Sequence, residues 1–420
     1  MLNLVDSLKE AQDLDQADSL KKFRDEFIFP QTTSGEKPLY FAGHSLGLMP
    51  KNAPEYVQEE MTAWGKYGVE GHFEGKNPWL PYHENITGSF ARLVGAKETE
   101  VVAMNTLTVN LHLLMISFYR PTKERFKILI ENNSFPSDKY GVDSQAKFHG
   151  FDPKEAIVEL KPRPGEMTVS QEDVQEQIKK LGNSLALILI GNCNYLSGQK
   201  FNFEKIVSAG HNVGAFVGFN LAHGAGNLDL KLHDWGPDFA VWCSYKYLNS
   251  GPGGLAGAFI HERHLGQKDL PRLAGWWGHN KVSRFKMGPD FDPLPTAEAW
   301  QLSNPPIFQL ASLRASMELF DQAQISNLRK KGDQLTSYFE ALIKKRLGEK
   351  VDIITPPTNE RGSMLSLRFR SDPKQWVPQL RARDVYVDFR EPDIIRATPA
   401  PIYNSYSDVY RLVQIFDAVT

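Results

Sequence analysis

The sequence predicts an α/β fold, in which helices cover both faces of a mostly parallel sheet, followed by a smaller α+β region. Two observations predict it. From about residue 84 to residue 260, short apolar runs with the composition of buried strands alternate with segments of helical spacing. Beyond Pro306 this alternation gives way to long helical segments and a few alternating strands.

The composition is that of an ordinary globular chain. Of its 420 residues, 41% are hydrophobic and 23% charged, and the net charge of -2 favours neither nucleic acid nor an anionic membrane as a partner. No apolar run approaches membrane-spanning length, and the N-terminus has no signal or transit pattern. The two cysteines, Cys193 and Cys243, end apolar runs, as buried thiols in a reducing compartment do. We therefore expect a cytoplasmic protein.

The first part of the chain is expected to form an arm. Residues 3–28 have helical spacing and predict one or two short helices, and residues 37–41 predict a strand that runs into the loop at 43–47. A helix is expected at 51–66. The loop at 68–81 is rich in Gly, Pro, His and Trp, which is typical of a loop that serves a site.

From residue 84 helices and strands alternate, which predicts parallel strands joined by crossover helices. Expected strands are 101–104, 126–130, 157–160, 185–190, 215–219, 238–243 and 256–260. Expected helices are 84–95, 109–119, one capped by Ser137 and Asp138, 170–181 and 202–213. Ser170 is predicted to open its helix with a capping box.

The C-terminal part predicts the smaller region. Helical spacing continues to about residue 347 with a break near Ser326, and Ser407 is expected to cap the terminal helix. Further expected elements are strand 363–369, helix 373–382 and strand 385–388. We divide the chain into an N-terminal arm (1–50), a large domain (51–307) and a small domain (308–420).

Polar residues follow two strands of the predicted sheet. Asn220 and His223 come after the run at 215–219, and Tyr245 and Lys246 come after the run at 238–243. Open α/β sheets bind their ligands at the carboxyl ends of the strands. A lysine just past a buried strand, with Asn-x-x-His upstream, is the layout of a lysine that binds an aromatic aldehyde cofactor covalently.

A glycine-rich segment, 249–257, follows this lysine and allows close approach of the backbone. It contains Gly251-x-Gly253-x-x-Ala256, but a strand rather than a helix comes next. It is therefore not a dinucleotide-binding loop.

These motifs, together with others along the chain, resemble the kynureninases, which are pyridoxal-5′-phosphate enzymes of fold type I. The matching segments follow in family order over nearly the whole chain: 43–47 (GHSLG), 104–112 (MNTLTVNLH), 135–138 (FPSD), 220–223 (NLAH), 242–246 (WCSYK), 275–279 (GWWGH), 303–306 (SNPP) and 396–405 (RATPAPIYNS).

The resemblance implies fold type I, with a mostly parallel central sheet between helices and a smaller C-terminal α+β domain. It implies pyridoxal phosphate as cofactor and a homodimer with the active site at the interface. The implied reaction is hydrolytic cleavage of the Cβ–Cγ bond of kynurenine or 3-hydroxykynurenine, giving anthranilate or 3-hydroxyanthranilate and alanine, in tryptophan catabolism and NAD biosynthesis.

Residue roles follow from the same resemblance. Lys246 would attach the cofactor and move protons, and Tyr245 would contact the phosphate and act as a general acid. Further cofactor-binding residues would be Leu107, Thr108, Phe135, Pro136, Ser137, Asp138, Gly191, Asn220, His223, Trp276 and Asn304, with Trp276 and Asn304 from the neighbouring subunit. The substrate would meet Arg396 with its α-carboxylate, and Ser45, His72, His279 and Asn304 at its aryl end. No metal is expected.

The helix start at Leu107 and Thr108 points to a phosphate site on its own account, because the free amides of a helix N-terminus suit an anion and this one follows a predicted parallel strand.

Two positions depart from the family pattern. His44 stands in place of a common Asn, and Asn220 stands where the family usually has Asp, whose charge keeps the ring nitrogen of the cofactor protonated. A neutral amide cannot hold that proton comparably, so Asn220 predicts an attenuated enzyme.

Two alternatives stay open. In the first, the chain is a cofactor-binding homologue or variant with little lyase activity. In the second, it is another fold type I enzyme such as a cysteine desulfurase or an aminotransferase. A desulfurase needs a reactive thiol on a mobile loop, whereas Cys193 and Cys243 end predicted strands.

Overall fold

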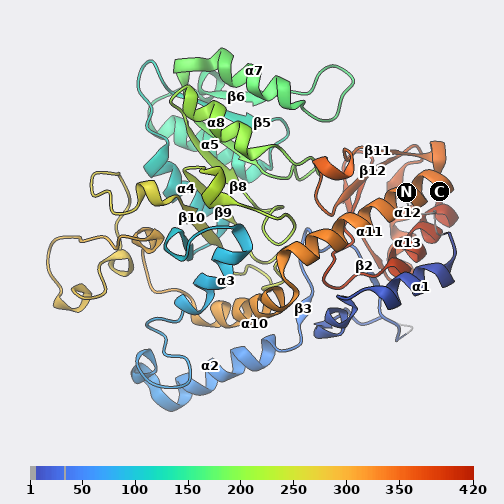
Figure 1. Ribbon diagram of the computed structural model, residues 1–420, viewed down its shortest axis with the longest axis horizontal. Helices are drawn as coiled ribbons and strands as arrows, with labels where there is room; N and C mark the ends of the chain where they lie inside the picture. Colours follow the sequence, from blue (N-terminus) through green and yellow to red (C-terminus); the bar gives the residue numbers. More distant parts are fainter. Residues whose placement is uncertain (1–5, 33–34) are drawn as a thin grey trace.

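The computed structural model describes residues 6–32 and 35–420. The larger body is built on a seven-stranded sheet of order β4-β10-β9-β8-β7-β5-β6 (Figure 1). Its strands are β4 (Val101–Ala103), β5 (Lys127–Glu131), β6 (Ile157–Leu160), β7 (Leu185–Gly191), β8 (Phe216–Asn220), β9 (Phe239–Trp242) and β10 (Gly257–Ile260). Neighbours from β9 to β6 pair in parallel, and β10 is antiparallel to both β9 and β4. The mostly parallel sheet is therefore confirmed.

Side chains alternate along the strands between two buried faces. On β5, Ile128 and Ile130 pack on one face, which is covered by α4 (Leu107–Phe118) and α5 (Pro136–Phe148). Leu129 packs on the other face, which is covered by α3, α7 and α8. These helices span Glu84–Val94, Gln171–Leu181 and Phe203–Asn212. Burial on both faces explains why the strands are unbroken apolar runs.

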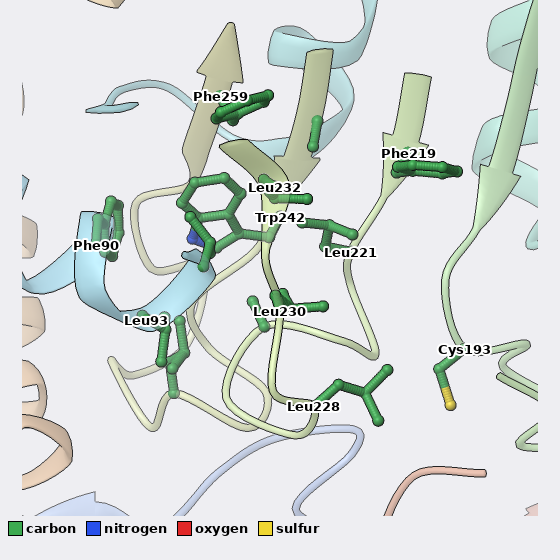
Figure 2. Packing of buried hydrophobic residues seen from close by; sticks show 14 of the residues in the cluster. Phe90, Leu93, Cys193, Phe219, Leu221, Leu228, Leu230, Leu232, Trp242 and Phe259 are labelled. Carbon is green, nitrogen blue, oxygen red and sulfur yellow. The ribbon is translucent and has the colours of Figure 1, made fainter. Parts of the chain in front are cut away.

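Trp242 fixes the end of β9, just before Tyr245 and Lys246. Figure 2 shows its indole with Phe90 of α3 and with Leu232, and the Phe90 and Trp242 ring centroids are 5.2 Å apart at 68°. Gly257 of β10 pairs directly with Trp242, and a Cβ there would come within 2.1 Å of the indole. Glycine at this position lets the large ring lie across the neighbouring strand.

The smaller body has a four-stranded sheet of order β11-β12-β15-β14. Its strands are β11 (Val351–Ile353), β12 (Leu365–Phe369), β14 (Asp388–Arg390) and β15 (Ile394–Ala397). Its helices are α11 (Ile325–Arg346), α12 (Pro373–Ala382) and α13 (Tyr406–Val419), and the arm helix α1 (Leu8–Ala17) lies beside α13 (Figure 1). These elements share a second hydrophobic core.

The arm is also held by a buried ion pair. Lys331 Nζ on α11 lies 2.7 Å from Asp18 Oδ2, and both side chains are nearly inaccessible to solvent. Because a buried charge is costly without a partner, each of these two residues requires the other. A 3-10 helix at Lys21–Glu26 follows α1, so the expected short helices are confirmed; residues 3–5 of that segment lie outside the described residues.

The helix α10 (Ile307–Ala323) packs against α2 (Ala53–Tyr67) and α3 and belongs to the core of the larger body. Gln324, with φ 63°, separates α10 from α11, close to the break expected near Ser326. The division of the chain at 307/308 stays a prediction.

The expected strand at 385–388 forms two strands, because its halves pair with different partners. β13 (Val385–Tyr386) runs parallel to β2 (Leu39–Tyr40) of the arm, whereas β14 pairs with β15. The remaining elements are β1 (Phe27–Ile28), β3 (Met49–Pro50), α6 (Pro153–Ala156) and α9 (Leu232–Trp235).

The predicted helix caps were partly wrong. Ser405, not Ser407, caps α13, in a capping box with Asp408. Ser137 and Asp138 lie inside the first turn of α5, because Pro136 takes the first helical position and Phe135 the cap.

Ser170 does cap α7, accepting from Asp173 N. In the predicted capping box the Asp173 side chain would also accept from the backbone amide of Ser170. It instead forms a 2.8 Å ion pair with Arg163. Among residues 6–32 and 35–420, no helix combines the length and apolarity needed to cross a membrane.

Candidate active site

One pocket opens at the carboxyl edge of the large sheet, between the ends of β5, β7, β8 and β9 and the N-termini of α4 and α5. The residues singled out by sequence that line it are Leu107, Thr108, Phe135, Ser137, Asp138, Gly191, Asn220, His223, Tyr245 and Lys246. Pro136 adjoins it as the first residue of α5. Lining residues that sequence analysis did not assign to the site are Glu131, Cys193, Tyr195 and Ala222.

Lys246 presents its amine inside this pocket. Nζ lies 3.3 Å from His223 Nε2 and 5.7 Å from the centroid of the Phe135 ring. Burial lowers the pKa of Lys246, because charge is costly where water is excluded. A lysine of lowered pKa is a better nucleophile toward a carbonyl group.

His223 is kept neutral, since burial and the nearby charge of Lys246 hold its pKa well below the usual value. Its Nε2 shares the 3.3 Å hydrogen bond with Lys246 Nζ. Nδ1 is buried and has no partner among the described residues. A buried polar atom of this kind suits a polar group on a bound molecule.

One end of the pocket is suited to an anion. Thr108 Oγ1 and Ser137 Oγ lie 2.9 Å apart and join the first turns of α4 and α5. Neither helix has a side-chain bond from its N-cap residue, Thr106 or Phe135. The uncapped first-turn amides of α4 and the positive ends of two helix dipoles therefore lie close together, which favours a phosphate group.

The side chain of Asn220 is held in one orientation. Its Nδ2 donates to Asp138 Oδ2 at 2.8 Å, and its Oδ1 accepts from Ala222 N at 2.9 Å. Burial raises the pKa of Asp138 to about 6, although the Asn220 hydrogen bond opposes the shift. The amide and the carboxyl group thus form one unit with the carboxyl as its ionisable member.

Glu131 lies behind this unit, at the end of β5. Burial, and then the charge of Asp138, raise the pKa of Glu131 to about 8. Its Oε1 accepts from Asn194 Nδ2 at 3.4 Å, and its Oε2 has no partner among the described residues. A Cβ at Gly191 would lie 2.7 Å from Oε1, so this glycine leaves room for the carboxyl group. In the sequence, Glu131 could have been recognised as a charged residue at the end of an apolar strand.

These residues fit pyridoxal phosphate. The cofactor requires an amine, a phosphate cradle, a stacking surface and a polar partner for its ring nitrogen. The pocket offers Lys246, the paired helix N-termini at Thr108 and Ser137, the ring of Phe135, and the Asn220–Asp138 unit.

Arg396 lies on β15 and reaches the pocket through Tyr195. Its guanidinium is buried and donates from Nη1 to Tyr195 O at 2.5 Å and from Nη2 to Asp388 Oδ2. The Tyr195 ring packs edge-on against Phe135, with centroids 5.5 Å apart. Sequence analysis missed Asp388, because its contact depends on the pairing of two strands.

Several residues predicted to bind substrate or cofactor do not line this pocket. Asn304 lies in another hollow, with Met104, Thr106 and Val109. His72 packs against Trp79, and Trp276, 41% exposed, packs against Phe285. His279 bonds to Ser283, and Ser45 is an exposed loop residue.

Sequence comparison finds closely related proteins. Residues 328–416 match the family described as "Kynureninase C-terminal domain". A kynureninase of Myxococcus xanthus (strain DK1622) is 58% identical over 414 residues, which cover 98% of this chain and 97% of that protein. One of Koribacter versatilis (strain Ellin345) is 52% identical over 409 residues, covering 97% and 96%.

Structural comparison confirms the fold. A C-DES variant with glycine covalently linked to its PLP cofactor has a TM-score of 0.77 at 16% identity and covers 94% of this chain and 99% of its own. The cysteine desulfurase CsdA of Escherichia coli has a TM-score of 0.76 at 17% identity, covering 96% and 98%. These neighbours share the PLP-dependent fold type I architecture; at such identity they show the fold alone.

The buried carboxyl of Glu131 predicts a pH-dependent stability. Because its native pKa lies above its value in the unfolded chain, the native state holds the proton more tightly, and stability is lost as pH rises from about 4.5 to about 8. In cofactor-free protein, the free energy of unfolding in urea should fall over this range by up to about 1.4 kcal/mol per pH unit. Glu131→Gln should flatten that slope.

Glu166→Gln, at an exposed position, is the matched control and should keep the slope. An unchanged slope in Glu131→Gln would show that Glu131 is ionised like a surface carboxylate.

Proposed function

Because the chain belongs to the kynureninase family, we propose that the pocket around Lys246 is where it cleaves the Cβ–Cγ bond of L-kynurenine or L-3-hydroxykynurenine. The products are anthranilate or 3-hydroxyanthranilate and L-alanine. The observation that carries this proposal is a buried lysine of lowered pKa at the carboxyl edge of the sheet, in a pocket that is also lined by an anion-binding helix start at Thr108 and by Asp138.

Pyridoxal phosphate, when bound, supplies an aldehyde that takes up amines and an electron-withdrawing ring next to the reacting bonds. Lys246 would hold this group, and its amine would be placed to move the proton at the substrate Cα. Water adds to the Cγ ketone, the Cβ–Cγ bond breaks, and the aryl carboxylic acid leaves. Burial raises the pKa of Tyr245 to about 12, so its phenol stays protonated at neutral pH and can donate a proton to the carbon left after cleavage.

Arg396 is proposed to bind the α-carboxylate of the substrate. A guanidinium matches a carboxylate with two parallel hydrogen bonds, and burial strengthens them. Arg396 is 2% exposed, and its Nε has no partner among the described residues.

Purified protein with pyridoxal phosphate should convert L-3-hydroxykynurenine to 3-hydroxyanthranilate, followed by product fluorescence. Lys246→Ala should abolish turnover and the visible absorbance of the covalently held cofactor, because no other amine lines the pocket among the described residues. Lys374→Ala, at an exposed lysine, should behave as wild type. Turnover by Lys246→Ala would overturn the assignment.

A desulfurase function has no support in the site. The thiol of Cys193 lines the pocket but is buried, and burial raises its pKa to about 12, which leaves it an inert thiol. Cys243 is buried too, and burial raises its pKa. Two free thiols of this kind fit the cytoplasmic location that we propose.

Asn220 favours a second candidate, a cofactor-binding homologue with little lyase activity. The Asn220 amide is committed to Asp138 and to Ala222 N, and it carries no charge for the ring nitrogen of the cofactor. The Asp138 carboxyl is the remaining ionisable group of this unit, and burial makes its charge costly. We therefore propose a kynureninase of reduced rate.

Asn220→Asp distinguishes the two candidates. It should raise kcat with L-3-hydroxykynurenine by roughly tenfold or more, because a second carboxylate favours the protonated ring. In cofactor-free protein it should also lower the melting temperature at neutral pH, since two carboxyl oxygens would then lie where a 2.8 Å donor–acceptor pair lies now.

Wild-type turnover that rises in the variant supports the attenuated kynureninase. Wild-type protein without turnover, restored by the aspartate, supports the inactive homologue. A variant no faster than wild type contradicts the role given to Asn220.

We also propose that the enzyme is a homodimer in which a partner subunit completes each site. Within one chain, Asn304, Trp276, His72 and His279 do not line the pocket around Lys246. Large exposed aromatics lie over α2, α10 and the loops between: Trp64, Phe73, Trp276, Phe285 and Phe308. Several contact one another, as Trp64 does Phe308. An exposed apolar surface of this kind suits a subunit contact.

Mixing two inactive variants tests this arrangement. Lys246→Ala and Asn304→Ala should each lose most activity, and dimers reassembled from both should regain it. One of their two sites then takes Lys246 from one subunit and Asn304 from the other. If both residues act from the same subunit, neither site of the mixed dimer is complete and activity stays low.

A further inference from the structure

Asp388 is the centre of a partly buried ion network beside the pocket. Its Oδ2 accepts from Arg396 Nη2, accepts from Arg390 Nη2 at 3.0 Å, and lies 3.4 Å from His44 Nε2. The Asp388 side chain is 15% exposed and that of Arg396 is 2% exposed. Strand pairing creates the contact, because Asp388 and Arg396 are direct partners on β14 and β15.

The network fixes the orientation of Arg396. Nη1 is bonded to Tyr195 O, whose residue lines the pocket, and Nη2 is bonded to Asp388. The planar guanidinium is thereby held from two corners, while its Nε–H is buried without a partner among the described residues. A carboxylate that bonded to Nε–H and to the second Nη2 proton would satisfy it side-on.

The charges of the network leave one positive charge uncompensated. Arg390 and Arg396 share the single carboxylate of Asp388. His44 adds no charge at neutral pH, because burial and the charge of Arg396 lower its pKa to about 4. Its Nδ1 is 2.9 Å from Thr398 Oγ1, which anchors the ring on the far side from Asp388. The Arg390 side chain is 39% exposed and screened by water, whereas Arg396 is buried, so its positive charge favours binding of an anion.

We propose that Asp388, supported by His44, is the positioning residue for Arg396, and that it holds the guanidinium ready for the α-carboxylate of an amino acid substrate. This inference rests on the function proposed for the pocket. Asp388 itself need not touch the substrate. It prevents the long arginine side chain from adopting other rotamers and sets which edge of the guanidinium stays unpaired.

The test compares a substrate with and without its α-carboxylate charge. Asp388→Asn should raise KM for L-3-hydroxykynurenine by roughly 10- to 100-fold, as expected for loss of one hydrogen bond to a charged group, with a smaller change in kcat. The α-carboxamide of the same substrate should lose much less, so the preference for acid over amide should fall. A merely structural role would weaken both compounds equally.

Asp393→Asn is the matched control, because Asp393 also pairs with an arginine, Arg368, at 3.4 Å, but both side chains are partly exposed, at 36% for Arg368 and 35% for Asp393. It should leave the acid-to-amide preference unchanged. Asp388→Glu keeps the charge and displaces it, and it should show a smaller selective loss. This second variant decides the matter if Asp388→Asn does not fold.

Binding of L-alanine, read from the visible absorbance of the cofactor, gives the same comparison without turnover. Its dissociation constant should rise in Asp388→Asn and not in Asp393→Asn. This measurement separates two failures: wild type that binds L-alanine but cleaves no kynurenine contradicts the proposed function, whereas equal losses for acid and amide, or no loss, contradict the role of Asp388.

Discussion

Exclusion of water from the carboxyl edge of the large sheet is the constraint on which the site depends. Burial moves each ionisable group there toward its neutral form: it lowers the pKa of Lys246 and of His223 and raises those of Asp138 and Glu131. Little water reaches this edge because the strands are apolar on both faces, and because Trp242 packs with Phe90 and Leu232 at the end of β9 (Figure 2). The core thus sets the chemistry, by deciding how much charge the edge can hold.

Two groups of polar residues in the pocket respond differently to the exclusion of water. At Thr108 and Ser137, uncapped helix amides provide positive potential without an ionised side chain, so nothing titrates there. At Asn220 and Asp138 an amide shares a site with a carboxyl group, which reduces the number of charges by one compared with two carboxylates. In a kynureninase with Asn220, the empty pocket is therefore free of repulsion between two carboxylates. The same amide gives up the charge that would strengthen electron withdrawal by the ring of the bound cofactor.

Features that depend on local pattern were predictable from sequence, and features that depend on remote partners were not. The strands ending at Asn220 and Trp242 could be read from their apolar runs, and a lysine beside them pointed to the cofactor. Cap predictions were wrong where one residue shifted the start of a helix. Pro136 takes the first helical position of α5, so Ser137 lies inside the first turn. Strand 385–388 was divided by partners far away in the chain, and the contact of Asp388 with Arg396 needed their register.

The interlocking of the two chain ends has a consequence for biosynthesis. The arm strand β2 pairs with β13, and α1 lies beside α13 (Figure 1). Asp18 forms its ion pair with Lys331. A ribosome that makes the chain from its N-terminus exposes the arm long before any of these partners exists. The large sheet, whose strands all lie between residues 101 and 260, can assemble on the nascent chain, whereas the arm can dock only after its partners on α11, β13 and α13 have been made. The arm is thus made before the large sheet but docks after it, and its apolar residues lack their packing partners in the interval.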